Sequence, residues 1–378
     1  MSTLAPQEQA VLDDARAFAD AHVRPLAAAW AQGAADTRAV LPLAAQAGLL
    51  GIEVPVAHGG RGLSFACKWR VAEILAAADF GFSMSWVNTH NVARHLADSA
   101  APEVARRYVP DLLAGRRTGC TALTEPGAGS DFSAITMQAR PDGAGWVLDG
   151  RKAWIVNATH ADVLVVYVQA EPGSGARGIA AFVVDGTREG FLRDPAADTS
   201  AARGIDTGGF RLQGYRARAD ELLHPAGQAF KAALGSINGA RTYVAAMCCG
   251  MVAECLRVAA DYGATRHSFG QPLQGHQGWR WSLADAAIDL QAARLLVEAA
   301  AARIDARQDA QTAAAQAKVF ATRMAGRHIA ALMHAMGAEG LRDAHPFLRH
   351  LAAAQVATLV DGSTEMLLER VARSLPRG

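Results

Sequence analysis

The texture of this sequence changes twice along the chain, from helical to β-like and back to helical. Up to about residue 115, apolar residues recur at helical spacing in alanine-rich stretches, at Glu8–Ala21, Ala39–Ala47, Cys67–Ala78, Met84–Ala97 and Glu103–Ala114. From about residue 118, short branched or aromatic runs are bounded by glycine and proline, at Gly145–Gly150, Asp162–Gln169 and Ile179–Gly186. After Pro225 the chain reads as helix again, at Ala226–Thr265, Trp279–Ala306 and Gln311–Gly337.

This order predicts an α+β protein of several domains. We expect an N-terminal α-helical domain over residues 1–117, a middle β-barrel or sheet domain over residues 118–225, and a C-terminal domain like a four-helix bundle over residues 226–378. The length of 378 residues agrees with this division, because it is too great for one core of ordinary size.

The composition excludes several classes of protein. The 37 basic and 36 acidic side chains leave a formal charge of +1, so we expect no nucleic-acid partner. The five cysteines are odd in number and lack Cys-x-x-Cys spacing, which argues against a disulfide framework and a metal site. The chain has no leader-like pattern and no run of about 18 apolar residues, so we expect a cytoplasmic protein without membrane insertion.

The segment Thr121–Asp131 (Thr-Ala-Leu-Thr-Glu-Pro-Gly-Ala-Gly-Ser-Asp) is the clearest candidate for a ligand site. A strand-like lead enters a turn in which Gly127 and Gly129 remove side chains that would keep a ligand away from the backbone. Thr124 and Ser130 supply short hydroxyl groups beside it. Such a turn can hold a flat ligand, although the same residues also occur in ordinary turns.

A second glycine motif, Gly173–Gly178, matches Gly-x-Gly-x-x-Gly and follows a predicted strand. A dinucleotide site of this type needs a helix after the motif, whose N-terminal amides meet the pyrophosphate. Here the next segment, Ile179–Val184, reads as another strand. We therefore interpret the motif as a hairpin loop and expect no nicotinamide-binding domain.

Six motifs in sequence order give the chain a resemblance to the acyl-CoA dehydrogenase family, spread over nearly its whole length. They are Gly48–Gly62, Leu123–Asp131, Lys152–Asn157, Arg266–Gln277, Gly337–Gly340 and Asp361–Thr364. The resemblance implies a fold with a helical, a β-barrel and a second helical part, with FAD between the barrel and the C-terminal bundle. It also implies a homotetramer or a homodimer.

The resemblance assigns roles to individual residues. It implies that the flavin is contacted by Leu123, Thr124, Gly129, Ser130, Trp154, stacked near the isoalloxazine, and Val156, beside its N5 atom. It implies that the pyrophosphate or adenine is reached by Arg266, Ser268, Phe269 and Gln277, often across a subunit boundary. The remaining implied cofactor residues are His334, Gly337, Ala338, Ser363 and Glu365, and the implied substrate residues are Ser130, Asn238, Arg241 and Gly362.

The implied chemistry is removal of the α-proton of an acyl thioester together with hydride transfer from the β-carbon to flavin N5. Asp361 stands where most members place a glutamate base, and it keeps the carboxylate with a reach shorter by about 1 Å. The other base position of the family is Ala240, which cannot serve. We favour Asp361 as a working base, while a different reaction, a weak enzyme and a helix N-cap stay open as other readings of this residue.

Two other functions remain open beside the dehydrogenase. Val156 occupies a position where the family usually has a hydroxyl donor to the flavin, which favours an altered oxygen reactivity and hence a monooxygenase or oxidase. The same departures would also fit a flavin-binding relative without catalysis. The partners implied for the dehydrogenase are an acyl-CoA or acyl-carrier-protein substrate and an external electron acceptor such as an electron-transfer flavoprotein.

Overall fold

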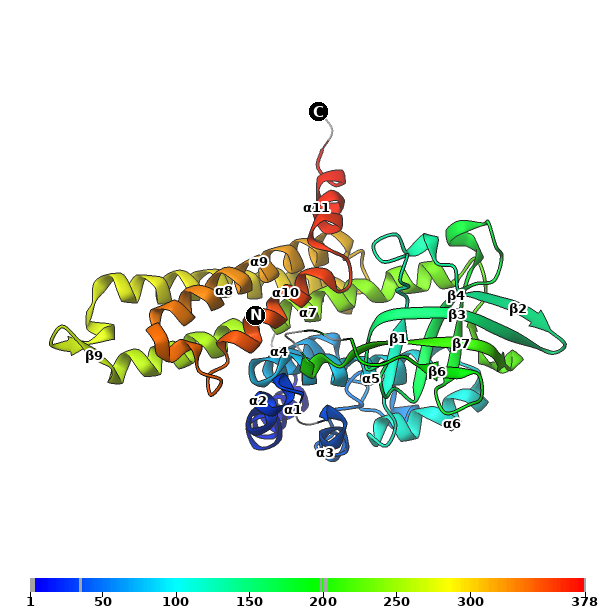
Figure 1. Ribbon diagram of the computed structural model, residues 1–378, viewed down its shortest axis with the longest axis horizontal. Helices are drawn as coiled ribbons and strands as arrows, with labels where there is room; N and C mark the ends of the chain where they lie inside the picture. Colours follow the sequence, from blue (N-terminus) through cyan, green and yellow to red (C-terminus); the bar gives the residue numbers. More distant parts are fainter. Residues whose placement is uncertain (1–3, 34–35, 198, 200–202, 377–378) are drawn as a thin grey trace. The chain divides into compact units, whose positions relative to one another are not determined.

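A computed structural model describes residues 4–33, 36–197, 199 and 203–376 of the chain (Figure 1). The chain forms two compact units. The helical unit consists of Met1–Ala35, Phe65–Ser83 and Ile237–Gly378, and the sheet unit consists of Asp36–Ser64 and Met84–Ser236. Along the sequence, helices come first, then a sheet, then helices again, which confirms the predicted fold class. The three-part division at residues 117 and 225 stays a prediction.

The sheet unit contains one mixed sheet of eight strands. Seven of them follow the order β6-β7-β3-β2-β4-β5-β8, and β1 pairs with β4 in parallel. Their bounds are β1 Gly119–Ala122, β2 Gln138–Asp142, β3 Gly145–Val156, β4 Val163–Gln169, β5 Ile179–Asp185, β6 Phe191–Arg193, β7 Thr207–Ala217 and β8 Leu222–His224. The strand β5 follows the Gly173–Gly178 motif and pairs antiparallel with β4, so the predicted hairpin loop is confirmed.

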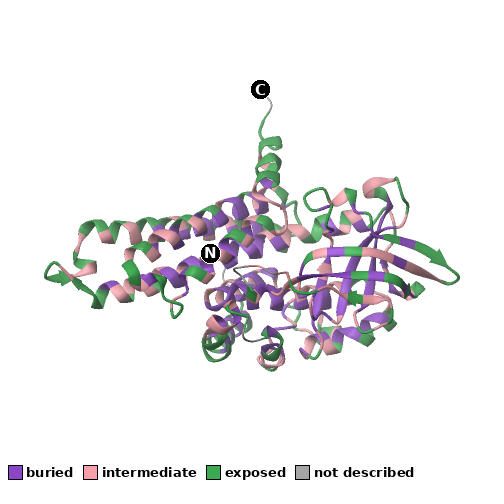
Figure 2. Cartoon of the chain, in the orientation of Figure 1, coloured by how far each residue is buried: buried purple, intermediate pink, exposed green. Residues whose placement is uncertain are grey.

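Strand β4 carries a core on each of its faces, which explains its unbroken apolar run (Figure 2). Val163, Val165 and Tyr167 point to one face, where the helices α5 (Phe80–Ser99) and α6 (Pro102–Leu113) contribute core residues. Leu164 and Val166 point to the opposite face, against side chains of β3 and β7. Because both faces of β4 are covered by core side chains, β4 is a rigid support for its neighbour β1 and for the loop that follows β1.

The helical unit is built around long alanine-rich helices. Its elements are α1 Pro6–Phe18, α2 Ala27–Ala31, α4 Phe65–Ala78, α7 Ala229–Thr265 (its first residues lie in the sheet unit), the hairpin β9 His267–Ser268 and β10 Gln271–Pro272, α8 Gln277–Asp305, α9 Gln311–Ala335, α10 Phe347–Leu359 and α11 Thr364–Arg373. The short α3 Leu41–Gln46 belongs to the sheet unit. Small buried residues such as Ala314 and Ala321 of α9 allow close packing of neighbouring helices.

The predicted N-terminal helices differ from the observed ones mainly at their ends. Helix α1 ends at Phe18 and continues as a π-helical turn over Ala19–Val23, and the stretch predicted at Ala39–Ala47 is a 3₁₀ turn followed by α3. Among the described residues, α7 alone is long and apolar enough to cross a membrane by length and composition, and 72% of its most apolar window is buried. A buried core helix of a protein can have the same length and composition, so α7 is not assigned as a membrane span.

Candidate active site

The segment Leu123–Asp131 leaves β1 and is anchored by a buried ion pair. Lys152 of β3 donates from Nζ to Leu123 O at 2.8 Å and to Glu125 Oε1 at 2.9 Å. Glu125 also accepts from the backbone amides of Thr136 and Met137, at 2.7 and 2.9 Å. Both charged side chains are almost fully buried, so the start of this loop is held at a defined distance from β3.

Two opposing effects act on the charges of this ion pair: burial disfavours both charged forms, and the attraction between the two groups favours them. Burial lowers the pKa of Lys152 to about 8, although the charge of Glu125 opposes this. Burial also acts to raise the pKa of Glu125, but Lys152 and the Thr136 and Met137 donors bring it below its usual value. The pair therefore exists near neutral pH at the cost of desolvating the lysine.

Trp154 lies next to this loop in an unusual backbone conformation. The pairing of β3 with β7 shifts register between Lys152 and Ile155, and Trp154 adopts a φ of 59° inside that irregularity. Ala153 N donates to Thr124 O at 3.1 Å, which joins the bulge to the loop. The indole is 64% exposed, although it belongs to a sheet strand. A bulky residue in the left-handed region is strained, and this is typical of functional sites.

The turn beside Trp154 has room for a ligand. A Cβ added at Gly127 or Gly129 would meet no atom within 4 Å, and both glycines and Ser130 are exposed. Leu123, Thr124 and Val156 are half-buried around it. The structure thus brings the six predicted flavin residues of the sheet unit onto one loop and one strand. An open glycine turn beside an exposed indole fits a flat aromatic group such as an isoalloxazine.

Asp361 occupies a turn between α10 and α11 in the helical unit. It has a φ of 53°, and Gly362 after it has a φ of 101°. Three consecutive carbonyl groups of this turn accept hydrogen bonds from two cations. Lys318 Nζ donates to Val360 O and to Gly362 O, the latter at 2.6 Å, and Arg241 Nε donates to Asp361 O at 3.0 Å. The backbone around the carboxylate is therefore fixed from both sides.

The Asp361 side chain is available for chemistry. Within the described part of the chain, no group donates a hydrogen bond to its carboxylate. Burial raises the pKa of Asp361, and the charges of Lys318 and Arg241 act against this rise. Raised basicity without a blocking partner is suitable for a general base.

One expectation about this turn needs correction. The alternative reading of Asp361 as the N-cap of the last helix is wrong, because Ser363 is the N-cap of α11 and its side chain accepts from Met366 N. Leu359, two residues before Asp361, is 68% exposed. Arg241, an expected substrate contact, uses Nη1 to donate to Asn238 Oδ1 at 3.2 Å and Nε to hold the turn.

Another group of expected cofactor residues gathers at the far end of the helical unit. Phe269 and Gly270 form the tip of the β9–β10 hairpin with positive φ, and Phe269 is 96% exposed. His276 donates to Ser268 O at 3.0 Å, and Trp279 Nε1 donates to Ala335 O at 2.9 Å. These contacts bring together Arg266, Ser268, Phe269, Gln277, His334, Gly337 and Ala338.

This end group does not meet the Asp361 turn. The turn contacts α9 at Lys318, whereas the end group contacts it at Ala335, 17 residues or about 25 Å of helix further on. Arg241 and Thr265 are likewise separated by 24 residues of α7, about 36 Å. Ser363 and Glu365 stay with the Asp361 turn, so the predicted cofactor residues of the helical unit form two separate groups.

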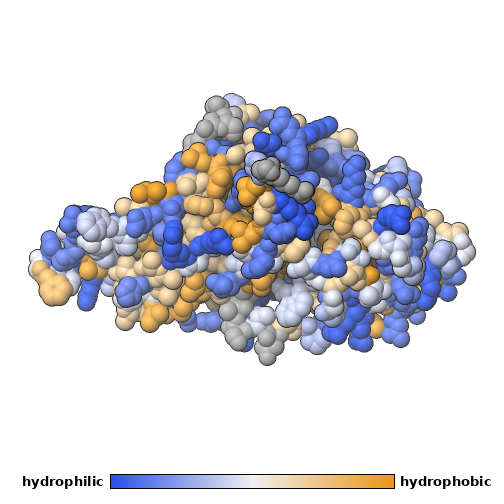
Figure 3. Space-filling model, turned by 90° about the horizontal axis from the view of Figure 1, so that it is seen from above, coloured by the Kyte–Doolittle hydropathy of each residue, from blue (hydrophilic) through white to orange (hydrophobic). Residues whose placement is uncertain are grey.

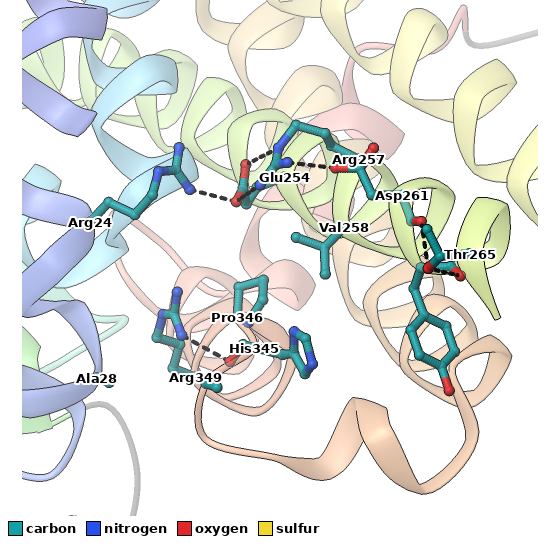
Figure 4. A pocket seen from close by; sticks show the side chains of 12 residues that line it. Arg24, Ala28, Glu254, Arg257, Val258, Asp261, Thr265, His345, Pro346 and Arg349 are labelled. Carbon is teal, nitrogen blue, oxygen red and sulfur yellow. Dashed lines mark hydrogen bonds and ion pairs between the residues drawn. The ribbon is translucent and has the colours of Figure 1, made fainter.

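A cavity of about 490 Å³ in the helical unit contains none of the predicted site residues (Figure 4). Its lining includes charged side chains of α7, Arg24 and Arg349 of α10, and it continues over Ala344–Pro346 before α10. These charges largely satisfy one another, because Glu254 accepts from Arg24 and from Arg257, and Arg257 also donates to Asp261 at 2.8 Å. The cavity therefore lies outside the candidate site.

Sequence reasoning did not assign roles to Lys152 and Lys318, which are both buried. Each donates to carbonyl groups of a candidate site loop, Lys152 to Leu123 O and Lys318 to Val360 O and Gly362 O. A usable signal existed for Lys318, because it lies among alanines in a helix face that is otherwise apolar. A lysine at such a position is rarely buried without a specific partner.

The open glycine turn beside an exposed indole in the sheet unit, and the carboxylate of the Asp361 turn in the helical unit, are each of a kind that flavoprotein oxidoreductases use. Three family models match the chain in sequence order. They describe the acyl-CoA dehydrogenase N-terminal domain, matched at residues 5–116, the middle domain, matched at 120–215, and the C-terminal domain, matched at 227–375. The short/branched chain specific acyl-CoA dehydrogenase of Rattus norvegicus is 30% identical over 95% of this chain and 83% of its own length.

Solved structures agree with these matches over the full chain. Butyryl-CoA dehydrogenase from Megasphaera elsdenii is 25% identical, with a TM-score of 0.95 and 100% of both chains covered. A chain from the work on the electron transferring flavoprotein of Acidaminococcus fermentans is 27% identical, with a TM-score of 0.95 and the same coverage. The protein belongs to the acyl-CoA dehydrogenase family, whose members are FAD-dependent flavoprotein oxidoreductases that dehydrogenate acyl-CoA.

Proposed function

We propose that the protein desaturates the α,β bond of a short-chain acyl-CoA thioester with Asp361 as the base. The observation that carries this proposal is the Asp361 turn, whose backbone is held by two cations and whose carboxylate accepts no hydrogen bond from the residues that the structure describes. Such a group suits proton abstraction, because it is fixed in place and its burial raises its basicity. The short acyl chain is proposed from the printed names of the similar proteins.

The proposed reaction breaks two C–H bonds and forms one C=C bond. The α-proton of the thioester passes to the Asp361 carboxylate, and the β-carbon loses a hydride. FAD supplies the two-electron acceptor for that hydride. The chain's own contribution is to bind the thioester, to hold the carboxylate within reach of the α-carbon and to exclude water from the reacting atoms.

The residues proposed to hold the flavin are the six of the sheet unit: Leu123, Thr124, Gly129, Ser130, Trp154 and Val156. Their open turn and exposed indole support this role. The proposed substrate contacts are Ser130, Asn238, Arg241 and Gly362. Arg241 would then act both on the turn and on the substrate, since its Nη2 atom would lie 3.4 Å from a Cβ placed on Gly362 and is directed toward that part of the turn.

We further propose a homo-oligomer in which a second copy completes the cofactor site. Two observations support this: the end group around Phe269 is separated along α7 and α9 from the Asp361 turn, and α8 carries a row of exposed apolar residues at seven-residue spacing. The row consists of Trp281, Ile288 and Leu295. Figure 3 shows that apolar patches lie among the hydrophilic side chains on the face that it displays. Exposed apolar rows of this kind are typical of helix interfaces between subunits.

An external electron carrier is proposed as the second partner, in line with the electron transferring flavoprotein work that includes a similar chain. CoA rather than a carrier protein is proposed as the thioester carrier, because the similar proteins are named for CoA esters. The cytoplasmic location and the domain limits at residues 117 and 225 are kept as proposals from the sequence.

The test is anaerobic reduction of the bound flavin by butyryl-CoA, isobutyryl-CoA and 2-methylbutyryl-CoA. The reduction is measured as the loss of flavin absorbance. Asp361→Asn is expected to keep FAD bound and to abolish reduction, while Asp361→Glu keeps at least part of it. Full reduction in the Asn variant refutes Asp361 as the base. If only the carrier-protein esters of the same acids reduce the flavin, the thioester carrier is a carrier protein and not CoA.

A monooxygenase or oxidase is the second candidate, and Val156 is the observation in its favour. Val156 is half-buried beside Trp154 and has no side-chain donor for a flavin edge. Oxygen consumption with formation of peroxide or of an oxygenated product would support this function over the dehydrogenase. No flavin reduction by any thioester and no oxygen consumption would indicate a flavin-binding relative without catalysis.

A further inference from the structure

Lys318 is a buried cation whose only hydrogen bonds in the described part of the chain go to two backbone carbonyl groups. It is 1% exposed and lies on α9 among the buried residues Ala314, Ala315 and Ala321. Its Nζ atom donates to Val360 O and to Gly362 O. Within the described ranges, no carboxylate lies at ion-pair distance from it.

This arrangement is costly for a group that would only fill space. An ammonium group loses its hydration on burial, and two carbonyl dipoles return part of that loss. The cost appears in the pKa of Lys318, which burial lowers to about 8. A methionine would fill the same volume without this penalty. We therefore expect the positive charge of Lys318 to have a function at the carbonyl groups that it contacts.

Those atoms flank Asp361 on both sides. Val360 O and Gly362 O belong to the residues immediately before and after it, and both Asp361 and Gly362 have positive φ. An aspartate in this backbone region is strained unless neighbouring groups hold it there. We propose that Lys318 is a positioning residue for Asp361, which holds the turn in its left-handed conformation and whose charge favours the carboxylate form.

The inference rests on the proposed function, because it takes Asp361 as the base. Arg241 of α7 is the second cation at the turn, and among the described residues of the turn it donates to one carbonyl, Asp361 O. Cys248 of α7 also faces Lys318, and Arg370 of α11 faces Arg241. Of these groups, only Lys318 bonds to both neighbours of Asp361, so its removal should free the turn while Arg241 remains.

The first measurement is hydrogen exchange of the holoprotein over residues 360–367. The amides of Val360, Met366 and Leu367 are hydrogen-bonded in this segment and give a protected baseline. Lys318→Met and Lys318→Gln should both speed exchange here, with less change after Gln, whose amide can still donate. The matched control is Thr322→Val one turn further along α9. Among the described residues, the Thr322 hydroxyl donates to helix carbonyls alone, Lys318 O and Val319 O.

The second measurement is the pH profile of anaerobic flavin reduction by butyryl-CoA. Lys318→Met should slow reduction by about tenfold to a hundredfold and move its midpoint to higher pH, because loss of the positive charge makes Asp361 harder to ionise. Lys318→Gln should share the shift in pH but lose less rate. Thr322→Val should leave both unchanged.

The outcomes separate the two proposals. Unchanged exchange at residues 360–367 and an unchanged pH profile in a folded Lys318→Met protein overturn the role of Lys318. Loss of helix content in both Lys318 variants also overturns it, because Lys318 would then support the whole bundle. If wild-type flavin is not reduced by any thioester, the proposed function fails, while hydrogen exchange still tests the positioning of the turn.

Discussion

The ion pair between Lys152 and Glu125 offers the strongest test of how the flavin loop is held. Lys152→Met removes two charge-assisted hydrogen bonds, to Leu123 O and to Glu125 Oε1, and leaves a buried carboxylate with its remaining donors. Breaking one side of a buried pair costs about 3–5 kcal/mol, which agrees with about 1.5–3 kcal/mol for each charged hydrogen bond. We expect a loss of stability of this size in the sheet unit.

Removing both charges should cost far less. The fall in the pKa of Lys152 from 10.5 to about 8 means that the fold disfavours the charged lysine by about 3 kcal/mol. The double variant Lys152→Met, Glu125→Gln leaves no unpaired buried charge, so its loss of stability should be smaller than that of Lys152→Met or of Glu125→Gln alone. FAD affinity should still fall by about tenfold to a hundredfold in both Lys152 variants, because Leu123 O loses its charged donor.

Hydrogen exchange at the β3 amides, followed in increasing urea, measures the stability of the sheet unit by itself. FAD affinity is measured by titration of the apoprotein with FAD. The two single losses should not add, and the coupling energy should exceed about 2 kcal/mol. Losses that add to within about 0.5 kcal/mol would refute a coupled pair, and unchanged FAD affinity would refute its link to the loop.

Three further predictions address stability, cofactor binding and assembly. Burial lowers the pKa of His350 to about 3 and of His95 to about 4, so each stays neutral in the fold while the unfolded chain gains a proton below pH 6.5. The free energy of unfolding should therefore fall by about 1.4 kcal/mol per pH unit and per histidine between pH 6 and pH 4. In the helical unit, His350→Gln should make this fall with pH less steep than in the wild type. Equal slopes in the variant and the wild type would contradict this. Trp154→Ala should weaken FAD binding by about tenfold and Trp154→Phe by less, in titrations of the apoprotein, and equal affinities would argue against stacking. Ile288→Lys should dissociate the oligomer in sedimentation velocity, and an unchanged mass would remove α8 from the interface.

Local pattern predicted most of the secondary structure, and it failed where backbone geometry depends on distant neighbours. Strand β7 was missed because Gly208 and Gly209 interrupt it, yet a Cβ on Gly209 would come within 2.6 Å of Lys152 O in the adjacent strand. The positive φ of Trp154 could not be predicted either, since it arises from the register shift between β3 and β7. The identity of Ser363 as the N-cap of α11 depended on which of several nearby polar residues the turn brings into place.

The amino-acid sequence by itself determined the order of helical and β segments, the family and the residue types at the flavin turn and at the base position. These follow from spacing over a few residues, where chain connectivity already brings the groups together. Only the tertiary structure decided how Asp361 is held, because Lys318 and Arg241 are 43 and 120 residues away from it in the chain. Burial of Asp361, which raises the pKa of its carboxylate, also exists only once the helices have packed.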